Sequence, residues 1–330
     1  MGSMNDKHQS VAVIIVNYGT AGLAIEAVES IRERKHSGLN VSIHLVDNNS
    51  PENDAEILAQ AHQSHGWGDQ VTLWPETENH GFGRGNNVVL NALDQMESPP
   101  DKVMLLNPDA RLTNETVSIL AQALEENQKA ASAGTLIGLT NGSFGASAFR
   151  FPSLTDEVVQ TLNFRIVSSW FSHLRVPLPA THPAGAVDWV SGTAVMFRFD
   201  ALRDVGFFDP EFFLYFEETE LQYRLHQKGW LALFVPSARV NHEQGASTGL
   251  LSEEDTRRSL PAYLYQSKWI YFRKTRGRFR SLIAAILVLG AGVLNVVHRR
   301  VRGREPTIAR RFFKDHIRFG LKHVLRWTSV

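Results

Sequence analysis

Apolar segments of strand length alternate with segments of helical spacing through the first third of this chain. The segment Val11–Asn17 is continuous and rich in β-branched residues, which is typical of a strand buried on both faces. Helical spacing follows in Leu23–Arg34, where apolar residues recur every four positions. Further strands are expected at Val41–Val46, Val71–Trp74 and Lys102–Leu106. This order predicts an α/β fold in which right-handed helical crossovers connect the strands of a parallel sheet.

Polar side chains stand at the carboxyl ends of these strands. Asn17 ends the first strand, Asp47 and Asn48 follow the second, and Asn107 and Asp109 follow the last. Open parallel sheets bind their ligands outside this edge. One such residue could serve only as a cap for the next helix, whereas three polar strand ends favour a ligand site.

The segment LLNPDA, residues 105–110, places a carboxylate directly after a buried strand. A carboxylate on a tight turn can hold Mg²⁺ or Mn²⁺, which take oxygen ligands and share them with substrate phosphates. A helix cap is the alternative for Asp109, but the next helix is expected only from about Asn114. We therefore expect Asp109 to bind a metal ion or a phosphate.

A glycine-rich segment, Glu78–Leu90, precedes another expected helix. Its glycines, Gly81, Gly83 and Gly85, allow close approach of a ligand to the backbone, and the amino end of a helix favours anions. The segment is not the dinucleotide-binding fingerprint, because its spacing differs and it follows the third strand. A phosphate-binding loop and a structural turn are equally compatible with it.

Three glutamates cluster where a helix is expected to begin within the aromatic segment Phe207–Trp230. They are Glu217, Glu218 and Glu220. Acids in the first turn of a helix are stabilised by its dipole alone. Apolar rings around a carboxylate also raise its pKa, which suits a general base. His242 follows a later strand and would complete a metal site, contact a phosphate or be structural.

Seven segments in this order and spacing resemble the inverting GT-A glycosyltransferases of family 2, and within them the bacterial rhamnosyltransferase-like branch. They are VIIVNYGT, VDNNS, NHGFGRGNN, LLNPDARL, DWVSGTAVMFR, VGFFDPEFFLYFEETELQYRL and GW. The resemblance extends from about Val11 to His242. It implies a GT-A fold, which is Rossmann-like with a mostly parallel sheet flanked by helices, and a transferase that uses a nucleotide-sugar.

The resemblance also implies donor-binding and metal-binding residues. Asn17 and Asp47 would face the base and ribose of the nucleotide. Asn107 replaces the first acid of the family's Asp-X-Asp motif, which leaves Asp109 as the main carboxylate ligand of Mn²⁺ or Mg²⁺, and His242 matches a late histidine that joins the metal. The rest of the nucleotide pocket would be Asn79, Gly81, Phe82, Gly83 and Asn86.

The same resemblance implies catalytic residues. Trp189 and Gly192 would border the sugar and the acceptor. Glu218 stands where the family usually carries the Asp that acts as catalytic base. Because Glu is longer by roughly one carbon–carbon bond, the carboxylate lies further out, and Glu217 is the alternative base.

The carboxyl-terminal part of the chain is strongly basic. Residues 268–330 contain 16 Lys and Arg against two acids, Glu305 and Asp315, so their net charge is +14. The whole chain has 34 basic and 34 acidic residues, which leaves a net charge of −14 for the remainder. A basic tail indicates an anionic surface, either membrane or nucleic acid. No recognition motif supports nucleic acid, so we expect none as a partner.

Two tail segments predict membrane association. Ser281–Val297 has 17 uncharged residues, slightly short of the roughly 20 needed for a full span. Thr307–Trp327 has apolar residues near helical spacing with Arg and Lys between them, which predicts a basic amphipathic helix on an anionic membrane surface. The alternative is that these helices pack on the domain or on another subunit in a homo-oligomer.

The chain is therefore expected to have three parts: residues 1–10 as a disordered N-terminus or tag remnant, 11–265 as the GT-A catalytic domain and 266–330 as a basic helical tail. The expected activity is metal-dependent, inverting transfer of L-rhamnose from dTDP-rhamnose, or of a hexose from a UDP-sugar. The expected acceptor is a lipid-linked or cell-surface glycan precursor, such as a polyprenyl diphosphate, at the cytoplasmic face of the inner membrane. A non-catalytic nucleotide-binding membrane scaffold is the alternative from another class. A nucleotidyltransferase finds less support, because no basic glycine-rich loop lies near the start of the chain.

Overall fold

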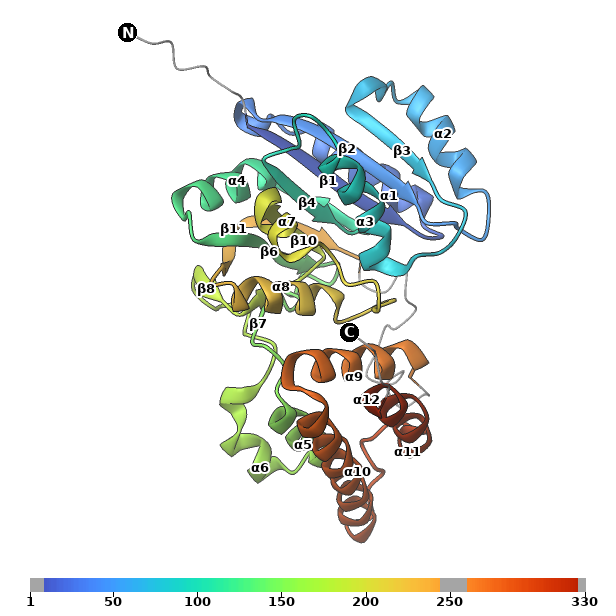
Figure 1. The fold of residues 1–330 in the computed structure, drawn as a ribbon, viewed down its shortest axis with the longest axis vertical. Helices are drawn as coiled ribbons and strands as arrows, with labels where there is room; N and C mark the ends of the chain where they lie inside the picture. The colour runs from blue at the N-terminus through green and yellow to red at the C-terminus, as the bar shows by residue number, and fades with distance from the viewer. Residues whose placement is uncertain (1–8, 244–259, 326–330) are drawn as a thin grey trace.

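The computed structural model describes residues 9–243 and 260–325, so residues 1–8 of the expected N-terminal segment and Trp327 lie outside the described residues. The described chain forms two stacked bodies (Figure 1). The upper body is a sheet with helices on both faces. The lower body is helical and combines segments that are far apart in the sequence.

The upper body is built on a nine-stranded sheet with the order β3-β2-β1-β4-β10-β6-β11-β5, and β8 pairs with β11 beside this path. Its strands are β1 (Ser10–Asn17), β2 (Asn40–Asp47), β3 (Val71–Pro75), β4 (Lys102–Leu106), β5 (Ala110–Leu112), β6 (Ala130–Leu139), β8 (Gly185–Val187), β10 (Ala194–Arg198) and β11 (Leu231–His242). β1 is parallel to β2 and β4, and β2 is parallel to β3. The four strands predicted from the apolar segments are therefore confirmed.

The other half of the sheet contains antiparallel pairs, which agrees with the mostly parallel sheet that the resemblance implies. β10 runs antiparallel to both β4 and β6. It follows β9 (Trp189–Val190), which pairs with β7 (Ala148–Phe149) in a separate small sheet, so no helical crossover leads into it. β6 has no counterpart among the predicted strands, because its sequence AASAGTLIGL begins with small residues of low strand propensity.

Two apolar cores lie on the two faces of the sheet. Along β1, Val13 belongs to one core and Ile14 to the other, as the alternation of side chains on a strand requires. The first core is closed by α1 (Ala21–Arg32), α2 (Asp54–Ser64) and α4 (Thr116–Glu126), and the second by α3 (Gly81–Asp94), α7 (Phe199–Val205) and α8 (Glu217–Gln227). Short 3₁₀ turns are η1 (His36–Gly38), η2 (Gly68–Gln70) and η3 (Ser172–Leu174).

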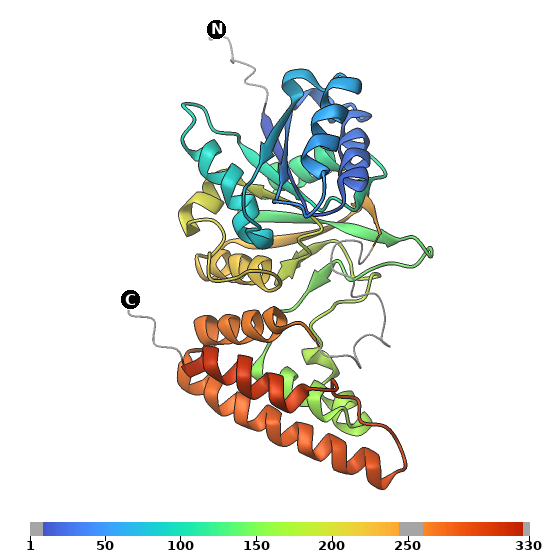
Figure 2. The same cartoon turned by 90° about the vertical axis from the view of Figure 1, so that its right-hand side faces the viewer.

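The lower body joins a mid-chain insertion to the basic tail. Its helices are α5 (Leu154–Leu162), α6 (Arg165–Trp170), α9 (Ala262–Arg276), α10 (Arg278–Val301), α11 (Phe312–Asp315) and α12 (Lys322–Leu325), with a π-helical turn at His316–Leu321. A third apolar core lies here and includes Trp269, Phe272 and Val288. Figure 2 shows α9, α10 and the last helices packed side by side. The helices of the tail therefore pack into a folded layer, and α5 packs against that layer.

The last tail segment packs differently from the predicted surface helix. Its first helix begins at Phe312, while the backbone N–H of Thr307 donates to Oδ1 of Asn295 on α10. Phe312 and Leu321 pack against the third core, and Gly292 of α10 leaves room for the Phe312 ring. Part of the predicted membrane-facing stripe is therefore half-buried against the protein. A continuous exposed apolar face belongs instead to α10.

Candidate active site

A cavity of about 380 Å³ opens at the carboxyl edge of the sheet, and we call it the donor cavity after the role that the resemblance implies for its residues. Asn79, Gly81, Phe82 and Asn107 all line it, as the sequence predicts for a nucleotide pocket. Its remaining lining residues are Val16, Tyr18, Asn48, Pro108, Phe213, Leu214 and Tyr263. The structure thus brings together the ends of β1, β2 and β4 with the start of α3.

Asn17 and Asp47 lie behind this cavity rather than on its wall. Both side chains are buried, and Nδ2 of Asn17 donates to Oδ1 of Asp47 and to Oδ2 of Asp54. The neighbouring Tyr18 and Asn48 reach the cavity instead. Contact of Asn17 and Asp47 with a nucleotide therefore stays a prediction, while their hydrogen bonds fix the two strand ends.

The amino end of α3 is held tightly against the wall of the donor cavity. Gly81 has a φ of +72°, and a Cβ atom there would lie 1.9 Å from the carbonyl oxygen of Phe213. Oδ1 of Asn79 accepts from the Gly81 N–H, and Nδ2 of Asn48 donates to the Gly81 carbonyl. Only glycine fits this approach, and the first backbone groups of α3 stay close to the cavity, where a helix amino end favours an anion.

Gly83 and Asn86 face the protein interior rather than the cavity. A Cβ on Gly83 would lie 3.1 Å from Cβ of Phe208, so Gly83 serves close packing. Asn86 is buried and its Nδ2 donates to the carbonyl of Phe82, one turn earlier. Ligand contact by these two residues stays a prediction, and the glycine-rich segment is the first part of a helix rather than a separate loop.

Asp109 and His242 meet at the edge of the sheet although they are far apart in sequence. Nε2 of His242 lies 3.0 Å from Oδ1 of Asp109, and the Asp109 side chain is buried. β5 follows Asp109 directly and pairs antiparallel with the end of β11, which carries His242. Since α4 begins only at Thr116, Asp109 caps no helix. The pair offers one carboxylate and one imidazole to a ligand.

Glu217 and Glu218 open α8 after two residues with left-handed backbone. Tyr215 and Phe216 have φ values of 67° and 68°, a conformation that costs roughly 1–3 kcal/mol per residue and persists where surrounding structure enforces it. Glu217 is 3% exposed, and Glu218 is partly exposed. The sharp turn thus lies directly before the two neighbouring carboxylates at the start of α8.

Burial controls the acidity of both glutamates. It raises the pKa of Glu217 well above the ordinary value, and the nearby charge of Glu218 raises it further. Burial also raises the pKa of Glu218, against which the backbone N–H groups of Glu218 and Thr219 act. Among the described residues, Oε2 of each glutamate has no hydrogen-bond partner. Both carboxylates therefore hold a proton more tightly than free glutamate does.

Glu218 faces a second cavity, which we call the acceptor cavity after the role that the resemblance implies for Trp189 and Glu218. Trp189 borders it with its indole stacked on Phe149 at a ring-centroid distance of 4.0 Å. Gly192 touches Glu218 from the other side, since a Cβ there would lie 3.4 Å from Cγ of Glu218. Trp189, Gly192 and Glu218 are thus brought together as predicted. Glu217 does not line this cavity.

The third acid of the cluster has a structural partner. Both carboxylate oxygens of Glu220 accept from Nε of Arg224, at 2.8 and 2.9 Å. Arg224 also donates to the backbone carbonyls of Val205 and Phe207. Glu220 therefore holds Arg224, which ties α8 to the end of α7 and the segment after it, and Glu220 lines neither cavity.

The two cavities are neighbours along two chain segments. Leu214 lines the donor cavity, and the next residue, Tyr215, lines the acceptor cavity. On α9, Tyr263 lines the donor cavity and its neighbour Leu264 lines the acceptor cavity. The backbone N–H of Asn107 donates to the carbonyl of Thr193, the residue after Gly192. A ligand in the first cavity would therefore lie next to the carboxylate of the second, as group transfer between two substrates requires.

Most of this chain matches a known protein family. Residues 8–260 match the family described as "Glycosyltransferase like family 2". The chain belongs to this family. The glycosyltransferase resembles the N-acetylglucosaminyl-diphospho-decaprenol L-rhamnosyltransferase of Mycobacterium tuberculosis, with 31% identity over 219 residues that make up 63% of this chain and 68% of the relative. Rhamnosyltransferase WbbL of Escherichia coli is 25% identical over 166 residues, which cover 49% of this chain and 61% of that protein.

Solved structures confirm that this glycosyltransferase has the GT-A fold. A mannosyltransferase from Pyrobaculum calidifontis in complex with GDP-Man and Mn²⁺ has a TM-score of 0.58 and 13% identity, over 97% of this chain and 88% of that one. The structure of GalNAc-T7 with UDP, GalNAc and Mn²⁺ has a TM-score of 0.57 and 14% identity, over 96% of this chain but only 58% of that longer chain. At such identities the likeness concerns the fold alone.

Three aromatic residues of the donor cavity, Tyr18, Phe213 and Tyr263, escaped prediction as pocket residues. Tyr18 is next to Asn17, so the strand-end pattern locates it to within one position, and Asn48 belongs to that pattern itself. Tyr263 stands on α9, and its ring centroid lies 6.1 Å from that of Phe213, a contact between segments that no local pattern relates.

Proposed function

We propose that this glycosyltransferase transfers a sugar from a nucleotide-sugar to an acceptor hydroxyl with inversion, and that Glu218 is the catalytic base. The observation that carries this proposal is that Glu218 lines the acceptor cavity beside Trp189, whereas Glu217 is sealed off from it. The raised pKa makes the Glu218 carboxylate a better proton acceptor. It takes the proton of the acceptor hydroxyl while that oxygen attacks the anomeric carbon, opposite the departing diphosphate. One displacement inverts the configuration and needs no enzyme nucleophile.

The residues at the sheet edge fit a divalent metal ion. Asp109 and His242 converge, and Nδ1 of His242 is a buried atom without a hydrogen-bond partner among the described residues. Within that part of the chain, no group of three His, Asp or Glu side chains surrounds one point. The donor phosphates would therefore supply the other ligands, and the ion would bind weakly before the donor arrives. When bound, Mn²⁺ or Mg²⁺ offsets the negative charge of the leaving diphosphate.

The donor in this proposal is dTDP-L-rhamnose, and a UDP-hexose is the second candidate. The rhamnosyl assignment rests on the two relatives, whose names specify rhamnosyl transfer. The aromatic lining of the donor cavity, from Tyr18, Phe213 and Tyr263, suits stacking of either pyrimidine base. The second candidate rests on the GalNAc-T7 structure, which holds UDP in the same fold.

The acceptor in this proposal is a polyprenyl-diphosphate-linked glycan at the cytoplasmic face of the inner membrane. The name of the mycobacterial relative specifies such an acceptor. α10 has 24 residues and a mean hydropathy of 2.1 in its most apolar window, yet 39% of that window is buried inside the protein. One face of α10 packs in the third core and the other is apolar and exposed, so the helix would lie in the membrane surface rather than cross it.

Transfer assays with purified protein test this function. dTDP-rhamnose and UDP-hexoses are offered as donors, with and without Mn²⁺, to a prenyl-diphosphate-linked N-acetylglucosamine. The expected result is metal-dependent product formation with one donor. Binding of nucleotide without turnover of any donor would instead favour the non-catalytic membrane scaffold.

A further inference from the structure

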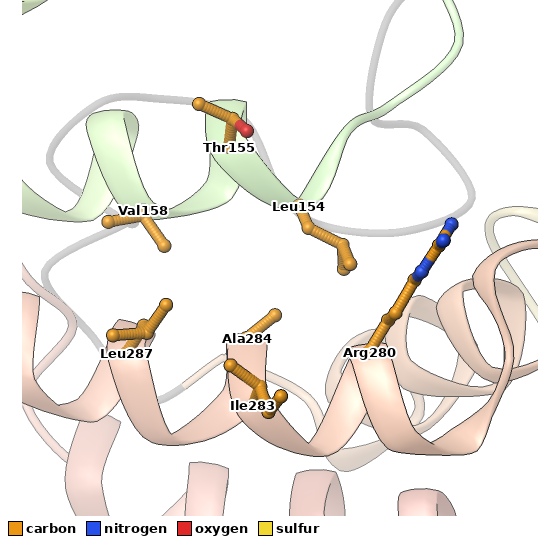
Figure 3. A pocket seen from close by; sticks show the side chains of 7 residues that line it. All are labelled: Leu154, Thr155, Val158, Arg280, Ile283, Ala284 and Leu287. Atoms are coloured by element: carbon orange, nitrogen blue, oxygen red, sulfur yellow. The ribbon is translucent and has the colours of Figure 1, made fainter.

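A groove in the lower body is separate from both cavities. It has a volume of about 360 Å³ and lies between α5 and α10. Its walls are Leu154, Thr155 and Val158 of α5, and Ile283, Ala284 and Leu287 of α10. Figure 3 shows these apolar side chains facing one another across the groove, with Arg280 standing at one end.

The groove opens onto the exposed apolar face of α10. Ile283 and Leu287 line the groove and are still 44% and 54% exposed. The same face continues along the helix through residues that recur every three or four positions, namely Ile286, Val293, Leu294, Val297 and Val301. An exposed apolar face of this length is typical of a surface that meets lipid. A hydrocarbon chain could pass from that lipid into the groove without crossing water.

Arg280 gives one end of the groove a positive charge. Arg280 is exposed, and among the described residues no carboxylate forms an ion pair with it. Arg278 and Arg280 both lie in the first turn of α10, which contains no acid. Cations are disfavoured by the dipole at a helix amino end, whereas a phosphate group is favoured there. An apolar groove that ends in this way is complementary to a chain with an anionic head.

The groove and the acceptor cavity share α5 as a wall. Leu154 and Val158 face the groove, whereas Glu157 and Gln160 of the same helix face the acceptor cavity. Pro152, just before α5, also lines the acceptor cavity, and its carbonyl accepts from Nη2 of Arg276. A ligand whose chain lies in the groove would thus have its head at the end of α5, on the side of Glu218.

We propose that the groove between α5 and α10 binds the prenyl chain of the lipid-linked acceptor, with Arg280 contacting its diphosphate. The assignment rests on the proposed function, since it concerns the acceptor of that reaction. It divides the acceptor between two places, the sugar in the acceptor cavity and the hydrocarbon chain on the far side of α5. The length of the prenyl chain would then affect binding of the acceptor but not binding of the nucleotide-sugar in the donor cavity.

Direct binding of farnesyl diphosphate, measured by calorimetry with the full chain in detergent, tests the groove without requiring turnover. Thr155 is exposed, so Thr155→Trp fills the groove without disturbing the core, and Thr155→Ser is its matched control. The expected result is an affinity about tenfold lower for Thr155→Trp, equivalent to about 1.4 kcal/mol, and unchanged for Thr155→Ser. Wild-type affinity in Thr155→Trp would overturn the proposal.

Charge removal gives a second, independent arm. Arg280→Gln should weaken the binding of farnesyl diphosphate but not that of the uncharged alcohol farnesol. Arg300→Gln, at the other end of α10, should change the binding of neither ligand. Equal binding of phosphatidic acid would assign the groove to bilayer lipid, and a change of sedimentation in Thr155→Trp would assign it to a second copy of the chain. Both results contradict the proposal. A protein that binds farnesyl diphosphate in the groove yet transfers no sugar would refute only the proposed function.

Discussion

Nε2 of His242 lies 3.0 Å from Oδ1 of Asp109 across 133 positions of sequence. The antiparallel pairing of β5 with the end of β11 makes this contact, since it sets His242 opposite Ala110. His242 ends β11, and Asp109 lies in the turn directly before β5, so the pairing of the two strands holds the two side chains beside each other. Such a fixed placement suits the binding of a small ion.

Removal of either side chain should weaken the binding of Mn²⁺ in the presence of nucleotide. Asp109→Asn should abolish metal-dependent turnover, because it removes the one carboxylate of the pair. His242→Ala should raise the Mn²⁺ concentration needed for half-maximal rate by roughly 10–100-fold, the usual loss for a disturbed metal shell. The measurement is a Mn²⁺ titration of initial rate, with the exposed His173→Ala as control. An unaltered titration in His242→Ala would leave the histidine without a metal role.

The two adjacent glutamates should differ sharply in their effect on turnover. Glu218→Gln removes the proposed base and should lower kcat by roughly 10²–10⁴-fold, with little change in nucleotide binding. Glu217→Gln should retain most activity, because this side chain does not reach the acceptor cavity. Steady-state kinetics of the two variants with circular dichroism as a check on folding make the comparison. The opposite ranking would move the base to Glu217.

Activity should also decline with acid sooner than for an unperturbed glutamate. Glu218 must be ionised to accept a proton, and burial raises its pKa above the ordinary value of 4.5. The rate therefore falls as the pH drops through the raised pKa. A pH profile of kcat/KM records this fall on the acid side. The Glu218→Asp variant should retain an acid-side fall with a different midpoint, whereas the Glu218→Gln variant should have none.

Glu217 should lower stability at neutral pH. Because burial raises its pKa, the folded protein binds the proton at Glu217 more tightly than the unfolded chain does. The free energy of unfolding therefore falls as the pH rises from the ordinary glutamate pKa to the raised one. Glu217→Gln should raise Tm at pH 7, and this gain should disappear near pH 4, where the carboxyl is protonated in both states. A gain that persists at pH 4 would point to packing rather than charge.

Tyr263 should contribute to donor affinity even though it stands on α9, a helix of the lower body. If its ring stacks on the nucleotide base, Tyr263→Ala should cost roughly 1–3 kcal/mol in donor binding, while Tyr263→Phe should bind normally. Calorimetry with dTDP or UDP measures this directly. The same loss for both variants would mean that the hydroxyl, not the ring, makes the contact.

Local sequence predicts much of the carboxyl edge of the sheet, whereas it does not predict how the helices of the lower body pack. Asn107 and Asp109 can be placed from sequence because a buried strand that ends in polar residues has one functional edge. The contribution of Tyr263 depends on how α9 docks, and docking is a long-range property. The apolar residues of the tail likewise do not reveal which face meets the protein, so Phe312 and Leu321 fit a membrane helix equally well by pattern.

The sheet shows the same division between local and long-range information. Four strands, β1, β2, β3 and β4, are continuous apolar segments, so the local sequence is enough to predict them. β6 consists largely of Ala, Ser and Gly, and a Cβ on Gly134 would lie 2.4 Å from Cβ of Val190. Close packing requires small residues in β6. Because small residues have low strand propensity, the sequence of β6 does not predict a strand.

The placement of Tyr263 and Leu264 on α9 has a practical consequence for anyone who trims this protein to improve its solubility. A fragment that ends before Ala262 would keep the whole sheet together with Asp109, Glu217 and Glu218, yet one wall of each cavity would be missing. Such a fragment should handle substrates poorly. Solubility is better sought by replacing exposed apolar residues of α10 that lie away from the groove, such as Val297 and Val301, with polar ones.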